Sequence, residues 1–196
     1  MNGATAMKME EHFTYADYLT WEDDHRWEII DGKAYQISAP SVDHQAVILE
    51  LAAFLHDFLK GKPCRAFVSP IDVRLHAQSE EDEGDDTVVQ PDILVVCDKK
   101  KIGVRAILGA PDLVIEVLSE STASRDHITK LKKYMEVGVK EYWIVNPSEK
   151  NVSIHIRKAE PPETTCETTV MEGDAVLRST VLPDIEIELS QIFAEI

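Results

Sequence analysis

The sequence predicts one domain of the α/β (α+β) class, in which a mixed β-sheet is flanked by helices. Across residues 113–145 an apolar run, a helical segment and a second apolar run follow one another, as in a strand–helix–strand unit. A hairpin pattern lies near the N-terminus, and short alternating segments after residue 151 predict a β meander. The chain shows no internal repeat and no linker composition, so residues 1–196 are predicted to form a single domain.

The first half of the chain predicts two helices and four strands. Thr14 and Ser41 are residue types that cap helix N-termini, and the segment after Ser41 has its apolar residues at helical spacing. Asp31 and Gly32 separate two strand-like segments, and an Asp-Gly pair in that position is typical of a hairpin turn. In order, the expected elements are a helix over residues 14–20, strands over 26–30 and 33–37, a helix over 41–60, and strands over 65–68 and 71–75.

The second half opens with an acidic stretch, residues 79–87, which is expected to be a solvated and mobile loop. Apolar runs predict two buried strands, and the basic segment between them is expected to be a connection. Ser124 is a candidate N-cap for the next helix, and Gly138 follows its end. In order, the expected elements are a strand over residues 93–96, a connection over 98–110, a strand over 113–118, the helix between Ser124 and Gly138, strands over 141–145, 152–156, 166–170 and 176–182, and a helix over 190–194.

The charge of the chain constrains its partners. There are 36 acidic residues against 20 basic ones, which gives a formal net charge of −16. Nucleic-acid-binding proteins usually carry a basic surface, so this balance argues against tight nonspecific DNA binding. A small basic groove or a contact bridged by a metal ion remains compatible with it.

The remaining composition predicts a protein of the reduced cytoplasm. No run of 18 apolar residues is present, so no membrane span is expected. Residues 1–12 are polar and acidic, lack the pattern of a secretory signal, and are expected to be disordered. Cys64, Cys97 and Cys166 are far apart and odd in number, so neither a zinc site nor a disulfide framework is indicated.

Two carboxylates in apolar surroundings suggest a metal site. Asp92 follows Pro91 at the head of one predicted strand, and Glu116 lies inside another. A carboxylate in a buried strand is costly unless a charged group holds it there, and a divalent cation shared by two carboxylates would do so. We therefore expect Mg²⁺ or Mn²⁺ at Asp92 and Glu116, which suggests phosphodiester chemistry. Alternatively, Asp92 is a turn residue and Glu116 belongs to a polar face or a buried ion pair.

The helix after Glu116 offers a third residue. Asp126, Lys130 and Tyr134 are spaced four residues apart and therefore share one stripe of that helix. The short intervening loop could bring the Lys130 ammonium near Glu116, where it could stabilise a phosphodiester transition state or orient the attacking water. The alternative is an Asp126–Lys130 ion pair on a solvated helix face.

Several stretches in this order resemble the Uma-two family, a branch of the PD-(D/E)XK nuclease superfamily that groups restriction-endonuclease-like proteins. The resemblance extends over roughly residues 15–147. The stretches are Arg-Trp-Glu-Ile-Ile-Asp-Gly at 26–32, Ser-Pro-Ile-Asp-Val-Arg-Leu at 69–75, Val-Gln-Pro-Asp at 89–92, Gly-Ala-Pro-Asp-Leu-Val-Ile-Glu-Val-Leu-Ser at 109–119, and Gly-Val-Lys-Glu-Tyr-Trp-Ile-Val at 138–145.

The resemblance implies a restriction-endonuclease-like fold and metal-dependent cleavage of DNA by a homodimer. Asp92 would be the PD aspartate and Glu116 the acid of the (D/E)XK half-motif. Leu118 stands where the superfamily has its lysine. In this family that lysine is moved to the following helix, and Lys130 matches the new place. The same features leave a second function open, a degenerate nuclease fold that serves as a binding or assembly module, which the acidic balance and Leu118 favour.

Three further residues are candidates for the site. Glu28 lies in the Glu-x-x-Asp-Gly stretch and could add an acid, or be an exposed residue of the hairpin. His44, in the first turn of the long helix, could approach the metal or a phosphate, or be a polar residue without a chemical role. Asp72 could add a carboxylate from a neighbouring strand, or be a partner for Arg74.

Overall fold

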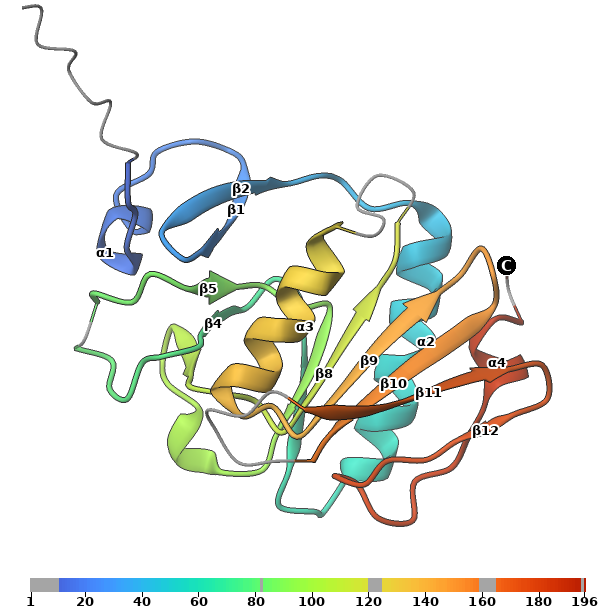
Figure 1. Cartoon of the computed structure of the whole chain (residues 1–196). Coiled ribbons are helices and arrows are strands. Elements are labelled where there is room, and N and C mark those ends of the chain that lie inside the picture. Colours follow the sequence, from blue (N-terminus) through green and yellow to red (C-terminus); the bar gives the residue numbers. More distant parts are fainter. Residues whose placement is uncertain (1–10, 82, 120–124, 159–164, 195) are drawn as a thin grey trace, which may run out of the picture.

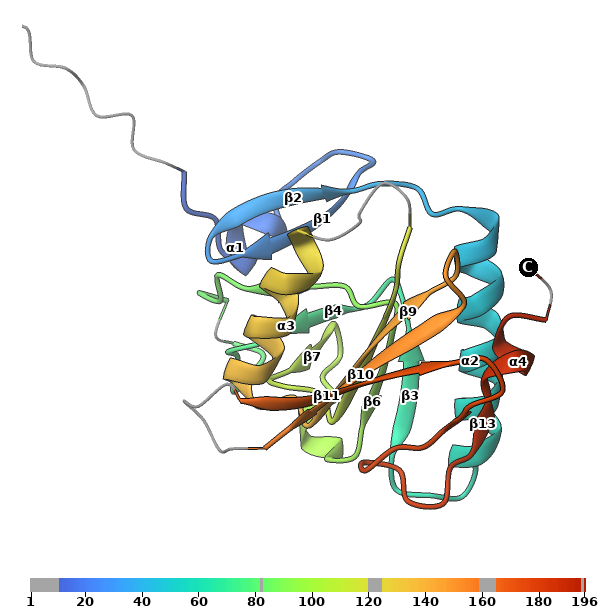
Figure 2. The ribbon, with the colours of Figure 1, turned by 45° about the vertical axis from the view of Figure 1, so that its right-hand side comes forward.

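The computed structural model describes residues 11–81, 83–119, 125–158, 165–194 and 196, and the side chains of 125–127 are not described. A six-stranded sheet forms the centre, with α3 on one face and α2 and α4 on the other (Figures 1 and 2). The elements are α1 (Tyr15–Tyr18), β1 (Arg26–Ile30), β2 (Lys33–Ile37), α2 (Val42–Leu59), β3 (Arg65–Val68), β4 (Asp72–Arg74), β5 (Val88–Val89), β6 (Ile93–Val96), the 3-10 helix η1 (Lys99–Lys101), β7 (Ala106–Leu108), β8 (Leu113–Val117), α3 (Arg125–Val137), β9 (Glu141–Asn146), β10 (Asn151–Arg157), β11 (Cys166–Glu172), β12 (Val176–Leu177), β13 (Ile187–Glu188) and α4 (Leu189–Ile192).

The predicted fold class is confirmed. The central sheet has the order β11-β10-β9-β8-β6-β3, and its β8 and β9 are parallel strands joined by α3, which is the predicted strand–helix–strand unit. The hairpin β1–β2 belongs to a second sheet of order β2-β1-β5-β4-β7, a division that the sequence did not predict. Its placement brings β1 over the face of the central sheet that carries α3.

The two helix caps and the hairpin turn lie where the sequence predicts them. The Thr14 side chain accepts a hydrogen bond from the backbone N–H of Asp17, and the Ser41 side chain accepts one from that of His44. Asp31 and Gly32 have φ angles of 51° and 75°, the left-handed conformation that a tight hairpin turn needs and that this residue pair tolerates.

The apolar strands of the central sheet divide their side chains between two cores. Ile93 and Val95 of β6 pack on the face of α2, whereas Leu94 and Val96 pack on the face of α3. Because side chains alternate along a strand, Ile115 and Val117 of β8 join the first core and place Glu116 on the face of α3. The predicted orientation of Glu116 is therefore confirmed.

Three expectations for the loops need correction. The basic connection contains η1 and β7, which the pattern missed because β7 has only three residues. The acidic stretch is not fully solvated, since Asp85 is buried with its Oδ2 4.0 Å from Nε of the buried Arg74, which needs an opposite charge. The last predicted strand is limited to β12, which pairs with the unpredicted β13.

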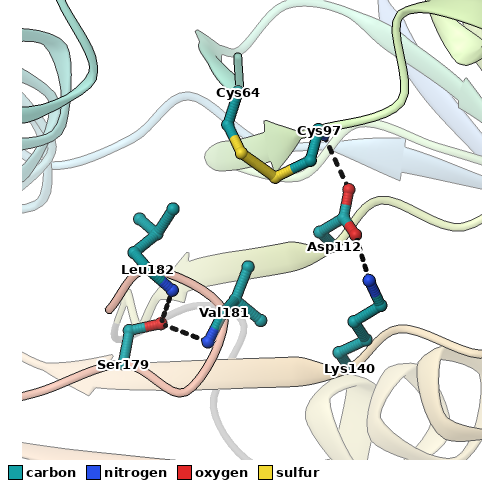
Figure 3. Close-up of a disulfide and its surroundings, with 7 residues drawn as sticks. All are labelled: Cys64, Cys97, Asp112, Lys140, Ser179, Val181 and Leu182. Carbon is teal, nitrogen blue, oxygen red and sulfur yellow. Dashed lines mark hydrogen bonds and ion pairs between the residues drawn. A yellow bond between two sulfur atoms is a disulfide. The ribbon is translucent and has the colours of Figure 1, made fainter. Parts of the chain in front are cut away.

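The expectation that no disulfide is present is wrong. Cys64 and Cys97 are joined, although 33 positions separate them in sequence, and Cys166 is free (Figure 3). The reason is strand register. Arg65 pairs with Val96 in the antiparallel β3–β6 ladder, so Cys64 and Cys97 are the next opposite residues. Asp112 holds the backbone N–H of Cys97, with a nitrogen-to-oxygen distance of 2.7 Å (Figure 3).

Two predictions lie outside the described residues, disorder over residues 1–10 and the Ser124 cap. Of the predicted disordered segment, Glu11 and His12 are described, and His12 Nε2 lies 3.2 Å from Asp86 Oδ2. None of the helices in the described ranges is long and apolar enough to cross a membrane.

Candidate active site

Strand register brings Asp92 and Glu116 together. In the antiparallel β6–β8 ladder Ile93 pairs with Ile115, so Asp92, one residue before β6, lies opposite Glu116. Directly opposite residues have their Cβ atoms about 4.5–5.5 Å apart and share a face of the sheet. The backbone N–H of Val117 donates to Asp92 Oδ2 at 2.8 Å, which fixes the aspartate against the neighbouring strand.

Lys130 reaches this pair from α3 and links it to the hairpin. Its Nζ lies 3.0 Å from Glu116 Oε1 and 2.8 Å from Glu28 Oε1. Glu28, on β1, is fixed by the backbone N–H of Gln90, which donates to the same Oε1 at 2.8 Å. The Lys130 side chain is only 11% exposed, so it does not lie on a solvated helix face. Two carboxylates from different sheets therefore share one buried ammonium group.

Tyr134 is a member of the site to which the sequence assigned no role, although it was placed on the same helix stripe as Lys130. It is fully buried, and its hydroxyl donates to Glu116 Oε1 at 3.0 Å. It lies one helical turn after Lys130, and this spacing was the available signal, because residues four apart on a helix face the same side. Glu116 Oε1 therefore accepts two hydrogen bonds from α3.

Burial and neighbouring charges set the protonation states of Glu116 and Lys130. Burial raises the pKa of Glu116 to about 7, with Lys130 opposing the rise and the nearby Asp92 and Glu28 adding to it. Burial by itself would lower the pKa of Lys130, but the carboxylates of Glu116 and Glu28 outweigh it and raise that pKa. At neutral pH Lys130 is therefore a fixed cation, and Glu116 is the group that takes up or releases a proton.

The other candidate residues divide into two groups. His44 joins the site, with Nε2 3.3 Å from Asp92 Oδ2, while its Nδ1 is buried without a hydrogen-bond partner in the described part of the chain. Asp72 lies apart from Lys130. It accepts a hydrogen bond of 2.9 Å from the Gln90 side chain, and burial raises its pKa. It is not the partner of Arg74, which faces Asp85 instead. Asp126 is in the first turn of α3, and its side chain lies outside the described residues.

Five of these residues, Glu28, His44, Asp92, Glu116 and Lys130, line a pocket of about 480 Å³. The hairpin forms one wall of it, with Glu28 and Tyr35, while Asp92, Glu116 and Lys130 lie along its floor. The pocket is within the size range of sites that enclose one small molecule.

The donor atoms fit a hard divalent cation. Within the described residues, Asp92 Oδ1 and Glu116 Oε2 accept no hydrogen bond, so one oxygen of each carboxylate is available. No cluster of three His, Cys, Asp or Glu side chains in the described ranges could by itself hold a metal ion. Mg²⁺ is commonly bound by one or two carboxylates together with water and substrate phosphates, which two available oxygens allow.

Comparisons with known proteins agree with this architecture. A family model described as "Uma2: Putative restriction endonuclease" matches residues 15–190. An uncharacterised protein of Synechocystis, slr1290, is 25% identical over 142 residues, which make up 71% of each chain. The crystal structure of a protein of Anabaena variabilis, described as a putative nuclease belonging to DUF820, superposes with a TM-score of 0.75 at 21% identity, over 93% of this chain and 98% of that one.

Proposed function

The chain belongs to the Uma2 family, and from this premise we propose that it is a metal-dependent endonuclease that hydrolyses DNA phosphodiester bonds in the pocket of Asp92, Glu116 and Lys130. One observation supports the proposal above all others. Lys130 is buried between the carboxylates of Glu28 and Glu116, and Asp92 lies opposite Glu116 on the neighbouring strand.

Each residue has a role that follows from its surroundings. Asp92 and Glu116 would hold Mg²⁺ or Mn²⁺ through their available oxygens. When bound, the cation lowers the pKa of a water molecule and neutralises charge on the phosphate. Lys130 remains protonated, so it acts as a charge that orients the water or stabilises the developing oxyanion, not as a base. Glu28 keeps the ammonium group in place.

The test is nicking of supercoiled plasmid DNA in Mg²⁺ or Mn²⁺ by the wild type and two variants. Glu116→Gln and Lys130→Met should abolish cleavage while far-ultraviolet circular dichroism stays native. Lys132→Met is the matched control, because Lys132 is an exposed residue of the same helix. Cleavage by both site variants at the wild-type rate would refute the assignment.

A second candidate is a binding or assembly module built on the same fold. It is favoured by the net charge of −16 and by the absence, within the described residues, of a complete metal-ligand cluster. Mn²⁺ distinguishes the two. The endonuclease should be stabilised by Mn²⁺ in a thermal melt and lose that response in Glu116→Gln, since a ligand of the native state raises the melting temperature. The module should show no response in either protein.

We also propose that the endonuclease is a homodimer, as the resemblance implies. Light scattering from a size-exclusion column measures the mass directly. A mass equal to one chain at all concentrations, with or without DNA, would contradict this proposal.

A further inference from the structure

One wall of the pocket carries a cation that the proposed chemistry does not use. Arg26 and Glu28 are two residues apart on β1 and therefore share one face of the strand. The ladder with β2 places Ile37 opposite Arg26 and Tyr35 opposite Glu28. All four side chains line the pocket. The hairpin lies near the N-terminal ends of α2 and α3 in both views (Figures 1 and 2). Its inner face therefore closes the pocket above the carboxylates.

Arg26 is held by neutral groups. Its Nε and one terminal nitrogen donate to Gln90 Oε1 at 3.0 and 2.8 Å, and the same terminal nitrogen donates to Ser69 Oγ. Within the described residues the direct contacts of the Arg26 guanidinium are these neutral oxygens and no carboxylate lies within ion-pair distance. Lys130, the other cation of the pocket, is already paired with two carboxylates. Arg26 thus brings a positive charge with no carboxylate in direct contact; Asp72, on the other end of the Gln90 amide, acts on it only through space. A guanidinium group held in one orientation is suited to bind a phosphate.

Gln90 connects Arg26 to the reactive group. Its backbone N–H donates to Glu28, which holds Lys130, while its side chain holds Arg26 and donates to Asp72 at 2.9 Å. One residue therefore fixes the spacing between the unpaired guanidinium and the candidate catalytic centre. Such a fixed spacing is what a site needs if it is to hold one phosphate while a neighbouring phosphodiester is positioned.

Exposed apolar side chains line the same pocket as this cation. Tyr35 is 45% exposed, and Leu49 and Val68 at the same pocket are 67% and 46% exposed. Tyr35 is diagonal to Arg26 on the same face of the hairpin. An exposed aromatic ring in the same pocket as a cation suits an unpaired nucleotide, because every base has a face that stacks and the cation holds the backbone. Glu116 and Lys130 are only 7% and 11% exposed below the hairpin, so a strand has to enter the pocket to bring a phosphodiester to them, and a flexible single strand does so more readily than a stiff, base-paired duplex.

Resting on the proposed function, we propose that Arg26 and Tyr35 form a subsite for one unpaired nucleotide, with its phosphate on Arg26 and its base on Tyr35. The substrate class is then single-stranded nucleic acid, or a duplex with unpaired nucleotides. Gln90 is a positioning residue for Arg26.

Fluorescence anisotropy of a short labelled oligothymidylate tests this subsite without requiring cleavage. Measured in EDTA and again in Ca²⁺, Arg26→Gln should weaken binding by about 10- to 100-fold, as expected for loss of a charge-assisted hydrogen bond. Tyr35→Ala should weaken it by about 5- to 100-fold, as expected for loss of one stacked base. Arg26→Lys should lie between Arg26→Gln and the wild type. Arg65→Gln is the matched control, because Arg65 is exposed, lies outside the pocket, and loses the same charge.

The salt dependence separates a phosphate contact from a structural effect. Loss of one phosphate contact should reduce the slope of log affinity against log salt by about 0.7 for a single strand in Arg26→Gln but leave it unchanged in Tyr35→Ala. Equal affinities of Arg26→Gln and Arg65→Gln, tighter binding of a fully paired duplex, or no binding by the wild type in either buffer would each overturn the subsite. Absence of cleavage by the wild type would instead count against the proposed activity, and the binding result would stand independently.

Discussion

Replacing Lys130 by methionine tests the electrostatic reasoning about the site directly. Lys130 lies 3.0 Å from Glu116 and 2.8 Å from Glu28, and methionine keeps much of its shape while removing the charge. Loss of one member of a buried ion pair typically costs about 3–5 kcal/mol, because the remaining charge is left without compensation. Tyr134 still donates to Glu116 and Gln90 still donates to Glu28, so the fold should survive.

The stability lost in Lys130→Met should depend on pH, and Glu116 determines whether that loss grows or shrinks as the pH rises. Its pKa in the folded protein is raised to about 7 from an ordinary value of 4.5, so its contribution to stability is fully present below 4.5 and is lost as the pH rises through 7. In the wild type this loss stops near pH 7, where Lys130 holds the ionised carboxylate. In Lys130→Met the pKa is higher still, so stability continues to fall by about 1.4 kcal/mol per pH unit above 7.

Urea unfolding followed by tryptophan fluorescence measures this effect, because Trp143 is fully buried. We expect Lys130→Met to lose about 3–5 kcal/mol at pH 8 and less at pH 5. Adding Glu116→Gln should recover at least about 1 kcal/mol at pH 8, since a neutral amide needs no counter-charge. Lys132→Met should change stability by less than about 1 kcal/mol, since its ion pair with Glu136 is exposed. A loss below about 1 kcal/mol that does not vary with pH would refute the reasoning.

Three further measurements follow from the site and the sheet. Calorimetric titration of Mn²⁺ should show affinity falling about tenfold per pH unit below 7, because a proton on Glu116 competes with the cation, whereas a flat profile would contradict the raised pKa. Tyr134→Phe removes a donor to that carboxylate, so the midpoint of the profile should move to higher pH at a cost of about 1 kcal/mol in stability, and an unmoved midpoint would argue against the bond. Alkylation of the unfolded, unreduced protein should label Cys166 alone, and labelling of all three cysteines would contradict the disulfide. Reduction of the bond between Cys64 and Cys97 should lower the free energy of unfolding by up to about 3–4 kcal/mol.

The local structure of the protein could be read from its sequence because local structure depends on near neighbours. The Asp31-Gly32 turn and the Thr14 and Ser41 caps form through groups within a few residues of each other. The alternation within β8 likewise fixed which face Glu116 occupies, since side chains alternate along any strand. The face of the sheet that a residue occupies on a regular strand can therefore be predicted from the sequence alone.

The members of the site were only partly readable. Asp92 and Glu116 stood out because a carboxylate in an apolar run needs a partner. Lys130 stood out by its place on the following helix and by the family resemblance. That Glu28 completes the group depends on the hairpin lying in a second sheet above the first, and no pattern near residue 28 encodes that position.

Register and sheet order were decided by the tertiary structure alone. The antiparallel pairing of β6 with β8 sets Asp92 opposite Glu116, and the pairing of β3 with β6 sets Cys64 opposite Cys97. A strand pattern specifies which face a residue occupies, but it does not specify the residue on the neighbouring strand that it meets. Local patterns in the sequence predict most of the helices and strands and the buried charges that need compensation. Long-range strand pairing determines which groups compensate them, because such contacts join positions that are far apart in the chain, and it also forms the short strands β7 and β13, which no local pattern indicates.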